Sequence, residues 1–188
     1  MRVSWLAGAL ALHGACTYAQ ANPPPITDAG WFEPIRAGVS LGIAPEANLA
    51  RLELRWDLRQ DLWDSATRSV RLRLGLEISA GAWDPHGGSS GAMGDIGLTP
   101  IFRLQGGGNA TAFVDLAIGA HLLSRTRISD TTVFSTAFQF GDRIAIGYRF
   151  DDAVHSELAL RLQHYSNGRI KRPNPGINFL LVQYSMQF

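Results

Sequence analysis

Residues 162–188 read LQHYSNGRIKRPNPGINFLLVQYSMQF, which is two extended segments joined by a loop rich in Gly, Pro and basic residues. In the second segment the even positions from 180 onward are apolar or aromatic as far as the last residue, Phe188, whereas the odd positions from 183 onward are polar. Alternation with a period of two predicts a β-strand whose two faces meet different surroundings. In the first segment the leucines also occupy even positions, so His164 and Ser166 share their face.

Eight alternating segments of this kind follow one another between residues 35 and 188. They cover residues 35–43, 50–59, 69–82, 95–104, 111–122, 138–150, 156–166 and 178–188. One face of each is nearly all apolar, and the other combines Arg with Glu or Asp, together with Gly and Ser. A soluble β-sandwich also alternates, so the polar faces decide between the two classes. Paired charges and glycines fit the closed interior of a narrow barrel, and apolar faces with aromatic ends fit contact with lipid.

The sequence therefore predicts an all-β fold, an eight-stranded antiparallel transmembrane outer-membrane β-barrel. The barrel must be closed, because hydrocarbon does not tolerate unpaired strand edges. Pro100 lies inside the fourth segment and lacks the N–H that a central strand needs, so we expect a bulge or a shifted strand boundary there.

The connections predict which end of the barrel faces outward, because barrels of this class have short periplasmic turns and longer outer loops. With both chain ends in the periplasm, the inner turns are 60–68, 105–110 and 151–155, and the outer loops are 44–49, 83–94, 123–137 and 167–177. His164, Ser166 and Asn178 then lie at the extracellular edge of the apolar band. We expect them to face the lipid of the outer leaflet.

The first 21 residues are typical of a secretory signal, since Arg2 precedes an apolar run and AQA at 19–21 supplies a small-residue cleavage site. We therefore expect residues 1–21 to be a signal peptide and residues 22–188 to form a single outer-membrane β-barrel domain. Cys16 is the only cysteine, which leaves none in the mature chain for a disulfide or a metal site. Loss of Arg2 brings the 17 Lys and Arg residues level with the 16 acids, so the charge gives no indication of nucleic-acid binding.

The motif His164-Tyr165-Ser166-Asn167, followed by KRPNPG at 171–176, resembles the PagL family of lipid A 3-O-deacylases. The quoted residues belong to the C-terminal hairpin, and the rest of the chain agrees in architecture. The resemblance implies an outer-membrane esterase that removes the acyl chain ester-linked at the 3-position of lipid A, without a cofactor. By position, Ser166 would be the nucleophile and His164 its general base. Asn167, with a nearby backbone N–H, would be a candidate for oxyanion stabilisation.

The residue types also permit this chemistry on physical grounds. A serine hydroxyl is a weak nucleophile until an adjacent base takes its proton, and residues i and i+2 of a strand share a face. Arg169, Lys171 and Arg172 could bind the phosphates of lipid A as point charges or bidentate forks. The alternative interpretation is that His164 and Ser166 are polar residues capping a strand, and that the basic side chains form a solvated loop near an anionic surface.

Two positions depart from the family pattern. Members carry Glu fourteen residues after the motif histidine, where this chain has Asn178, and often Gly where it has Arg169. An Asn can orient the imidazole but cannot supply the carboxylate charge that stabilises an imidazolium. Asp142 is a candidate for the missing acid. If residue 150 pairs with residue 156, the register places Asp142 opposite His164 on the outward face.

The other histidines of the expected mature chain, at 86, 121 and 155, have no partner at metal-ligand spacing, so we expect no metal site. The expected partners are lipid A or lipopolysaccharide and the outer membrane, and the oligomeric state is left open between a monomer and a homodimer. The competing class is a non-enzymatic barrel, either a structural or adhesion protein or a deacylase relative that has lost activity. A lipid-facing His-Ser pair favours the enzyme, because a structural barrel has no need of one.

Overall fold

The computed structural model describes residues 30–86, 91–107, 110–150 and 152–188. They form the strands β1 (Arg36–Ile43), β2 (Ala47–Asp57), β3 (Trp63–Asp64), β4 (Val70–Pro85), β5 (Met93–Gly106), β6 (Ala112–Leu123), β7 (Phe138–Arg149), β8 (Glu157–Ser166) and β9 (Ile177–Gln187). The expected signal peptide lies outside the described residues. Among the described residues, no helix is long and apolar enough to cross a membrane.

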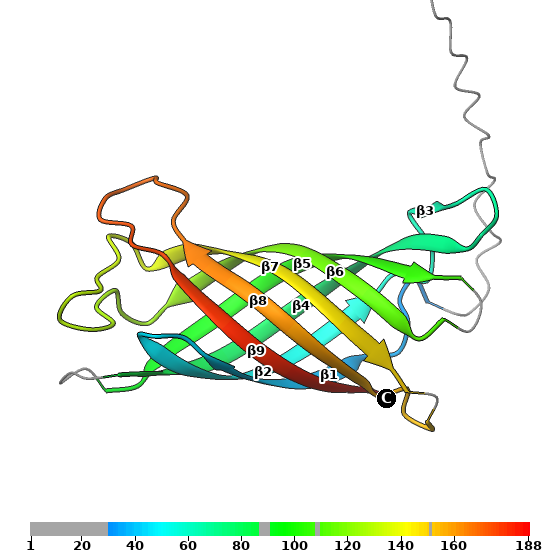
Figure 1. Cartoon of the computed structure of the whole chain (residues 1–188), viewed down its shortest axis with the longest axis horizontal. Helices are drawn as coiled ribbons and strands as arrows, with labels where there is room; N and C mark the ends of the chain where they lie inside the picture. Colours follow the sequence, from blue (N-terminus) through cyan, green and yellow to red (C-terminus); the bar gives the residue numbers. More distant parts are fainter. Residues whose placement is uncertain (1–29, 87–90, 108–109, 151) are drawn as a thin grey trace, which may run out of the picture. The chain divides into compact units, whose positions relative to one another are not determined.

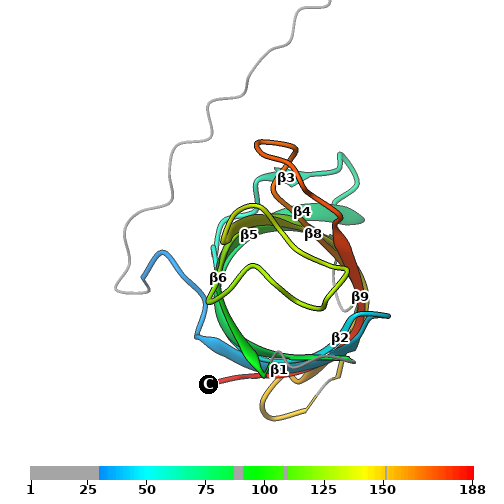
Figure 2. The ribbon, with the colours of Figure 1, turned by 90° about the vertical axis from the view of Figure 1, so that its left-hand side faces the viewer.

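Eight long antiparallel strands close into a barrel (Figures 1 and 2). Strands that follow one another in sequence are neighbours, apart from β3, and β1 pairs with β9 while β2 pairs with β4. The two-residue β3 pairs with β4 near its start. The predicted eight-stranded antiparallel barrel is confirmed. We call the end with the connections 44–46, 86–92, 124–137 and 167–176 the long-loop end, and the end where β1 begins and β9 finishes the terminal end.

Three strands extend farther toward the long-loop end than the alternation predicted. β2 begins at Ala47, β4 continues to Pro85 and β5 begins at Met93, whereas the expected boundaries were 50, 82 and 95. The added inward positions carry buried apolar side chains, including Leu49 and Trp83. The expected boundaries were too short because the inward face changes here from polar to apolar, which weakens the alternation.

Pro100 lies within β5 without a bulge, so the expectation of a bulge or a shifted boundary is wrong. Pro100 pairs with Leu76 of β4. In the described ladder between β5 and β6, pairs are missing at Thr99 and Pro100, and pairing resumes in the same register beyond them. The strand thus accommodates the missing N–H by losing pairing locally.

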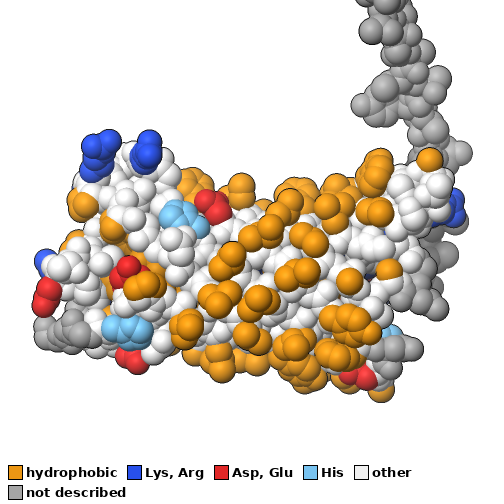
Figure 3. Space-filling view, viewed as in Figure 1, with side chains coloured by type: hydrophobic (Ala, Val, Ile, Leu, Met, Phe, Trp, Pro, Cys, Tyr) orange, Lys and Arg blue, Asp and Glu red, His pale blue; other side chains and the backbone are white. Residues whose placement is uncertain are grey.

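The two faces of the sheet differ as the alternation predicted. Exposed aliphatic and aromatic side chains lie on the outside, among them Leu160 and Val182. Figure 3 shows such side chains as a band across one face of the barrel. The inside carries buried arginines and carboxylates, namely Arg36, Arg51, Arg55, Arg103, Arg143 and Arg161 with Glu53, Asp57, Glu77, Asp95, Asp115 and Glu157. Ion pairs join them, such as Arg161 with Glu53 at 2.7 Å. The interior charges therefore compensate one another, as charges taken out of water must.

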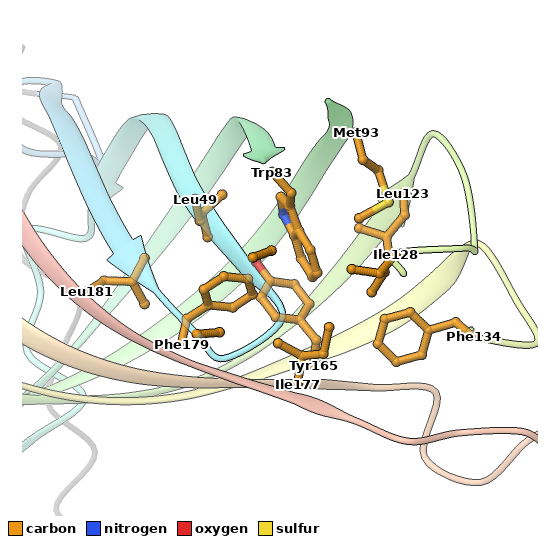
Figure 4. Packing of buried hydrophobic residues seen from close by; sticks show 12 residues of the cluster. Leu49, Trp83, Met93, Leu123, Ile128, Phe134, Tyr165, Ile177, Phe179 and Leu181 are labelled. Carbon is orange, nitrogen blue, oxygen red and sulfur yellow. The ribbon is translucent and has the colours of Figure 1, made fainter. Parts of the chain in front are cut away.

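An apolar cluster fills the interior at the long-loop end (Figure 4). It includes Trp83 and Tyr165, whose rings meet edge to face with centroids 4.8 Å apart. The connection between β6 and β7, residues 124–137, crosses the barrel mouth (Figure 2) and contributes Ile128 and Phe134 to the cluster. We call this connection the cap loop. Sequence reasoning treated it as an outer loop and did not foresee that it packs into the barrel.

Candidate active site

Three outward side chains form a row across β7, β8 and β9 near the long-loop end. Asp142 lies directly opposite His164, and His164 lies directly opposite Asn178. The neighbouring Gln163 and Phe179 are buried inside the barrel, so the row points outward. The predicted register of the strand pair 138–150 and 156–166 is confirmed, including a backbone hydrogen bond of 2.8 Å from the N–H of residue 150 to the carbonyl of residue 156.

The imidazole of His164 is bonded to Asn178 rather than to Asp142. Its Nδ1 lies 2.8 Å from Asn178 Oδ1. A carbonyl oxygen can only accept, so Nδ1 carries the proton and Nε2 is left as the basic nitrogen. Orienting a histidine through Nδ1 is the function that the third member of a catalytic triad performs. Here an uncharged amide takes that position, and the interpretation of Asp142 as the acid stays a prediction.

Ser166 follows His164 by two residues on the same face of β8 and is half-buried. It is the last residue of the strand: it pairs with Phe140 of β7, whereas pairing with β9 ends one residue earlier, at Tyr165. Among the hydrogen bonds of the described residues, none joins His164 to Ser166. Side-chain rotation would have to bring the two together, and catalytic hydrogen bonds commonly tighten only when substrate binds.

Gly176 packs against the ring of His164. A Cβ at this position would lie 2.7 Å from His164 Cε1, and the backbone has a φ of +71°, a left-handed conformation that favours glycine. Two independent constraints therefore favour glycine here. They explain why the loop sequence KRPNPG ends in glycine immediately before β9 begins.

Asn167 is fully buried and is hydrogen-bonded both to the cap loop and to the β8–β9 loop. Its Nδ2 donates to Ser135 Oγ at 2.9 Å and to the Lys171 carbonyl at 2.8 Å, and its backbone N–H donates to Asn174 Oδ1 at 3.0 Å. These bonds join the cap loop to the β8–β9 loop. To act as an oxyanion donor, Asn167 would have to exchange one of these partners, so that interpretation also stays a prediction.

The basic side chains expected to meet phosphates, Arg169, Lys171 and Arg172, are all exposed in the β8–β9 loop. Figure 3 shows basic groups at the tip of this loop, at the upper left. Arg169 has a φ of +66°, a left-handed conformation that favours glycine, the residue that the family resemblance often leads one to expect here. The loop extends away from the apolar band (Figures 1 and 3).

Tyr165, between the two candidate catalytic residues, points into the barrel. Its hydroxyl donates to Asp95 at 3.0 Å and accepts a hydrogen bond from Arg51. Asp95 in turn pairs with Arg51 at 2.7 Å and with Nδ1 of His121 at 2.9 Å. The stretch of β8 that carries the site is thus anchored to the interior. Sequence reasoning missed this residue, although its inward parity among buried charges could have indicated it.

An apolar groove of about 580 Å³ lies on the outside of the barrel. Its lining includes Leu180, which follows Asn178 by two residues on the same face of β9. The other lining residues are Leu41, Gly42, Ile43, Asn48, Leu49, Ala50, Ala82, Trp83, Asp84, Ala92 and Val182. A mostly apolar concave surface of this kind suits a hydrocarbon chain.

The histidines at 86 and 121 lie apart from the outward row. His86 Nδ1 is 3.1 Å from the Pro45 carbonyl, and His121 is buried against Asp95. Over the described ranges, no group of three His, Cys, Asp or Glu residues is arranged to hold a metal ion.

A closed antiparallel barrel with a lipid-facing band and a compensated ionic interior defines a class, the outer-membrane β-barrels. The particular family follows from comparison with known proteins. The chain belongs to the lipid A 3-O-deacylase (PagL) family, whose model matches residues 48–187.

Individual relatives agree with this assignment. The chain is 32% identical to the lipid A deacylase PagL of Bordetella bronchiseptica over 186 residues, which is 97% of this chain and 95% of that protein. It is 30% identical to the lipid A deacylase PagL of Pseudomonas aeruginosa over 143 residues, 72% of this chain and 76% of that protein. A crystal structure of the outer membrane enzyme PagL superposes with a TM-score of 0.71 at 26% identity, covering 81% of this chain and 99% of that one. The protein is therefore an enzyme of the outer membrane, a hydrolase of the lipid A deacylase family.

Proposed function

We propose that this enzyme hydrolyses the 3-O-linked acyl ester of lipid A with a Ser-His pair at the outer leaflet. The observation that carries the proposal is the bond from His164 Nδ1 to Asn178. It leaves Nε2 of His164 as a base on the lipid-facing side, where Ser166 follows on the same strand face. The long-loop end would then face the cell exterior, at the level where lipid A lies.

The chemistry would proceed in two stages. His164 Nε2 accepts the proton of the Ser166 hydroxyl while Oγ attacks the ester carbonyl carbon, and the negative charge collects on the carbonyl oxygen. Collapse of this intermediate breaks the bond to the sugar oxygen, which takes the proton from the imidazolium and leaves an acyl-serine. Water, deprotonated by the same histidine, then attacks the acyl-serine and releases the fatty acid and the free serine.

The surroundings of the pair suit this substrate. Exposed apolar residues below the row, such as Leu162 and Leu180, would contact acyl chains, and the groove that begins at Leu180 offers room for one of them. Arg169, Lys171 and Arg172 in the loop above would meet the phosphates of lipid A by charge-assisted hydrogen bonds. No step requires a second copy of the chain, so the homodimer stays an open prediction.

The decisive experiment is mass spectrometry of lipid A from cells that express the wild type, Ser166→Ala or Ser124→Ala. Ser124 is an exposed serine at the same end of the barrel, whose Oγ accepts a bond from the Gly94 N–H. We expect the wild type and Ser124→Ala to remove the 3-O-acyl chain and Ser166→Ala to leave it in place. If wild type and Ser166→Ala, both inserted in the membrane, leave the 3-O-acyl chain in place, the result would favour an inactive relative or a structural barrel. Removal of the chain by both would exclude Ser166 as the nucleophile.

A further inference from the structure

Ser135 of the cap loop is bonded to the loop that follows the proposed nucleophile. Its Oγ donates to the Lys171 carbonyl at 2.8 Å and accepts a hydrogen bond from Asn167 Nδ2 at 2.9 Å. Its backbone N–H donates to the Pro173 carbonyl at 3.1 Å. One serine thus contacts the β8–β9 loop at three points, although it is 31 residues from Ser166 in sequence.

The cap loop itself is firmly seated. Phe134, next to Ser135, and Ile128 are both buried in the apolar cluster, where Tyr165 and Ile177 also lie (Figure 4). Backbone hydrogen bonds close the loop on itself, from Phe134 N–H to the carbonyl of residue 126 at 2.8 Å and from Ile128 N–H to the carbonyl of residue 132 at 2.9 Å. Ser135 therefore extends from a rigid base and not from a free loop tip.

The bonds of Ser135 to the β8–β9 loop matter because Ser166 lies at the end of β8. Ser166 is the last paired residue of β8, because pairing with β9 has already ended at Tyr165. From Asn167 onward the sheet no longer holds the chain, and the conformation at Ser166 depends on what fixes Asn167. Ser135 contributes to fixing it by binding both its side-chain amide and the Lys171 carbonyl to which that amide also donates. Thr136 Oγ1, 3.3 Å from the same amide, and Asn174, which accepts the backbone N–H, are further partners of Asn167.

We propose that Ser135 is a positioning residue for the hydrolytic reaction. It acts through Asn167 to keep the hydroxyl of Ser166 within reach of the imidazole of His164. This inference rests on the proposed function and adds the cap loop to the catalytic apparatus. Ser135 does not touch the substrate. Its contribution is to reduce the conformations open to Ser166, and misplacement of a reacting group by a fraction of an ångström lowers the rate of the chemical step far more than it lowers binding.

The test compares Ser135→Val with Ser135→Thr, two side chains of nearly equal shape that differ in the hydroxyl. We expect Ser135→Val to lower kcat about tenfold with little change in KM, as for loss of a group that acts on the transition state. Ser135→Thr keeps the hydroxyl and should restore most of the rate. The matched control is Ser129→Ala in the same loop, because, within the described part of the chain, Ser129 Oγ binds only residues 131 and 132.

A second readout is the rate at which a fluorophosphonate labels Ser166 in the purified, detergent-folded enzyme. We expect labelling to slow in Ser135→Val, to recover in Ser135→Thr and to be unchanged in Ser129→Ala, with the folded barrel verified by its heat-dependent gel mobility. Equal kcat and labelling rates for Ser135→Val and Ser135→Thr would overturn the inference. Labelling and turnover that persist in Ser166→Ala would overturn the proposed function instead, so the two failures are distinguishable.

Discussion

Replacing Asn178 by glutamate would supply the carboxylate that the resemblance to the PagL family leads us to expect at this position. In the present structure His164 Nδ1 donates to a neutral amide oxygen over 2.8 Å. When the imidazole takes the serine proton it becomes positively charged, and a carboxylate stabilises that charge better than an amide does. A neutral hydrogen bond contributes a net ~1 kcal/mol and one to a charged group ~2 kcal/mol. Asn178→Glu should therefore lower the barrier by ~1 kcal/mol, which raises kcat about fivefold.

The opposite change, Asn178→Ala, removes the bond and should lower kcat by a similar factor, about fivefold. Both variants are measured with purified enzyme on lipid A in detergent micelles, by following fatty-acid release at saturating substrate. Asp142→Asn belongs in the same series, because Asp142 is the other candidate for the acid. A large loss in Asp142→Asn, with Asn178→Glu and Asn178→Ala both equal to wild type, would refute the assignment of Asn178 and return the acid to Asp142.

The orientation of β8 is checked by single cysteines at Leu162 and Gln163, which are 56% and 2% exposed. A fluorophore attached at residue 162 should be quenched by lipid-bound quenchers. Quenching at residue 163 in place of 162 would show that the two faces of the strand are reversed. Gly176→Ala should lower kcat at least tenfold while the barrel still folds, because the new Cβ would displace the ring of His164 and the residue has a positive φ. Kinetics measured beside a urea unfolding curve separate the loss of activity from any loss of stability. Arg169→Gly should stabilise the barrel by up to ~1 kcal/mol, since an L side chain is disfavoured at a φ of +66°, and an unchanged urea midpoint would count against this reasoning.

The placement of the outward row could be predicted from the sequence. Period-two alternation assigns His164 and Ser166 to the lipid side, and a short antiparallel connection fixes the register that places Asp142 opposite His164. Both properties belong to the backbone and need no knowledge of side-chain packing. The choice between Asp142 and Asn178 as the partner of Nδ1 was beyond the sequence, because it depends on side-chain rotamers at positions that flank His164 equally.

Long-range packing was the other part that the sequence could not supply. The cap loop has no periodic pattern that would indicate that it packs into the barrel. Ile128 and Phe134 are the apolar residues of this loop that pack there. Pro100 failed for a related reason. The missing N–H predicted a bulge or a shifted strand boundary, whereas the pairing of β5 with β4 on its other side keeps the strand in register.

The ion pairs inside the barrel bear on a property of the whole cell envelope, its permeability. Arg103 and Glu157, 2.7 Å apart, belong to a network of salt bridges across the lumen. The apolar cluster under the cap loop closes the mouth of the barrel. A hydrated ion could cross only by breaking such pairs and leaving desolvated charges without partners, at a cost of several kcal/mol for each. We therefore expect the protein to show no conductance steps in a planar lipid bilayer. A membrane can then hold many copies of this enzyme without losing its value as a barrier to small solutes.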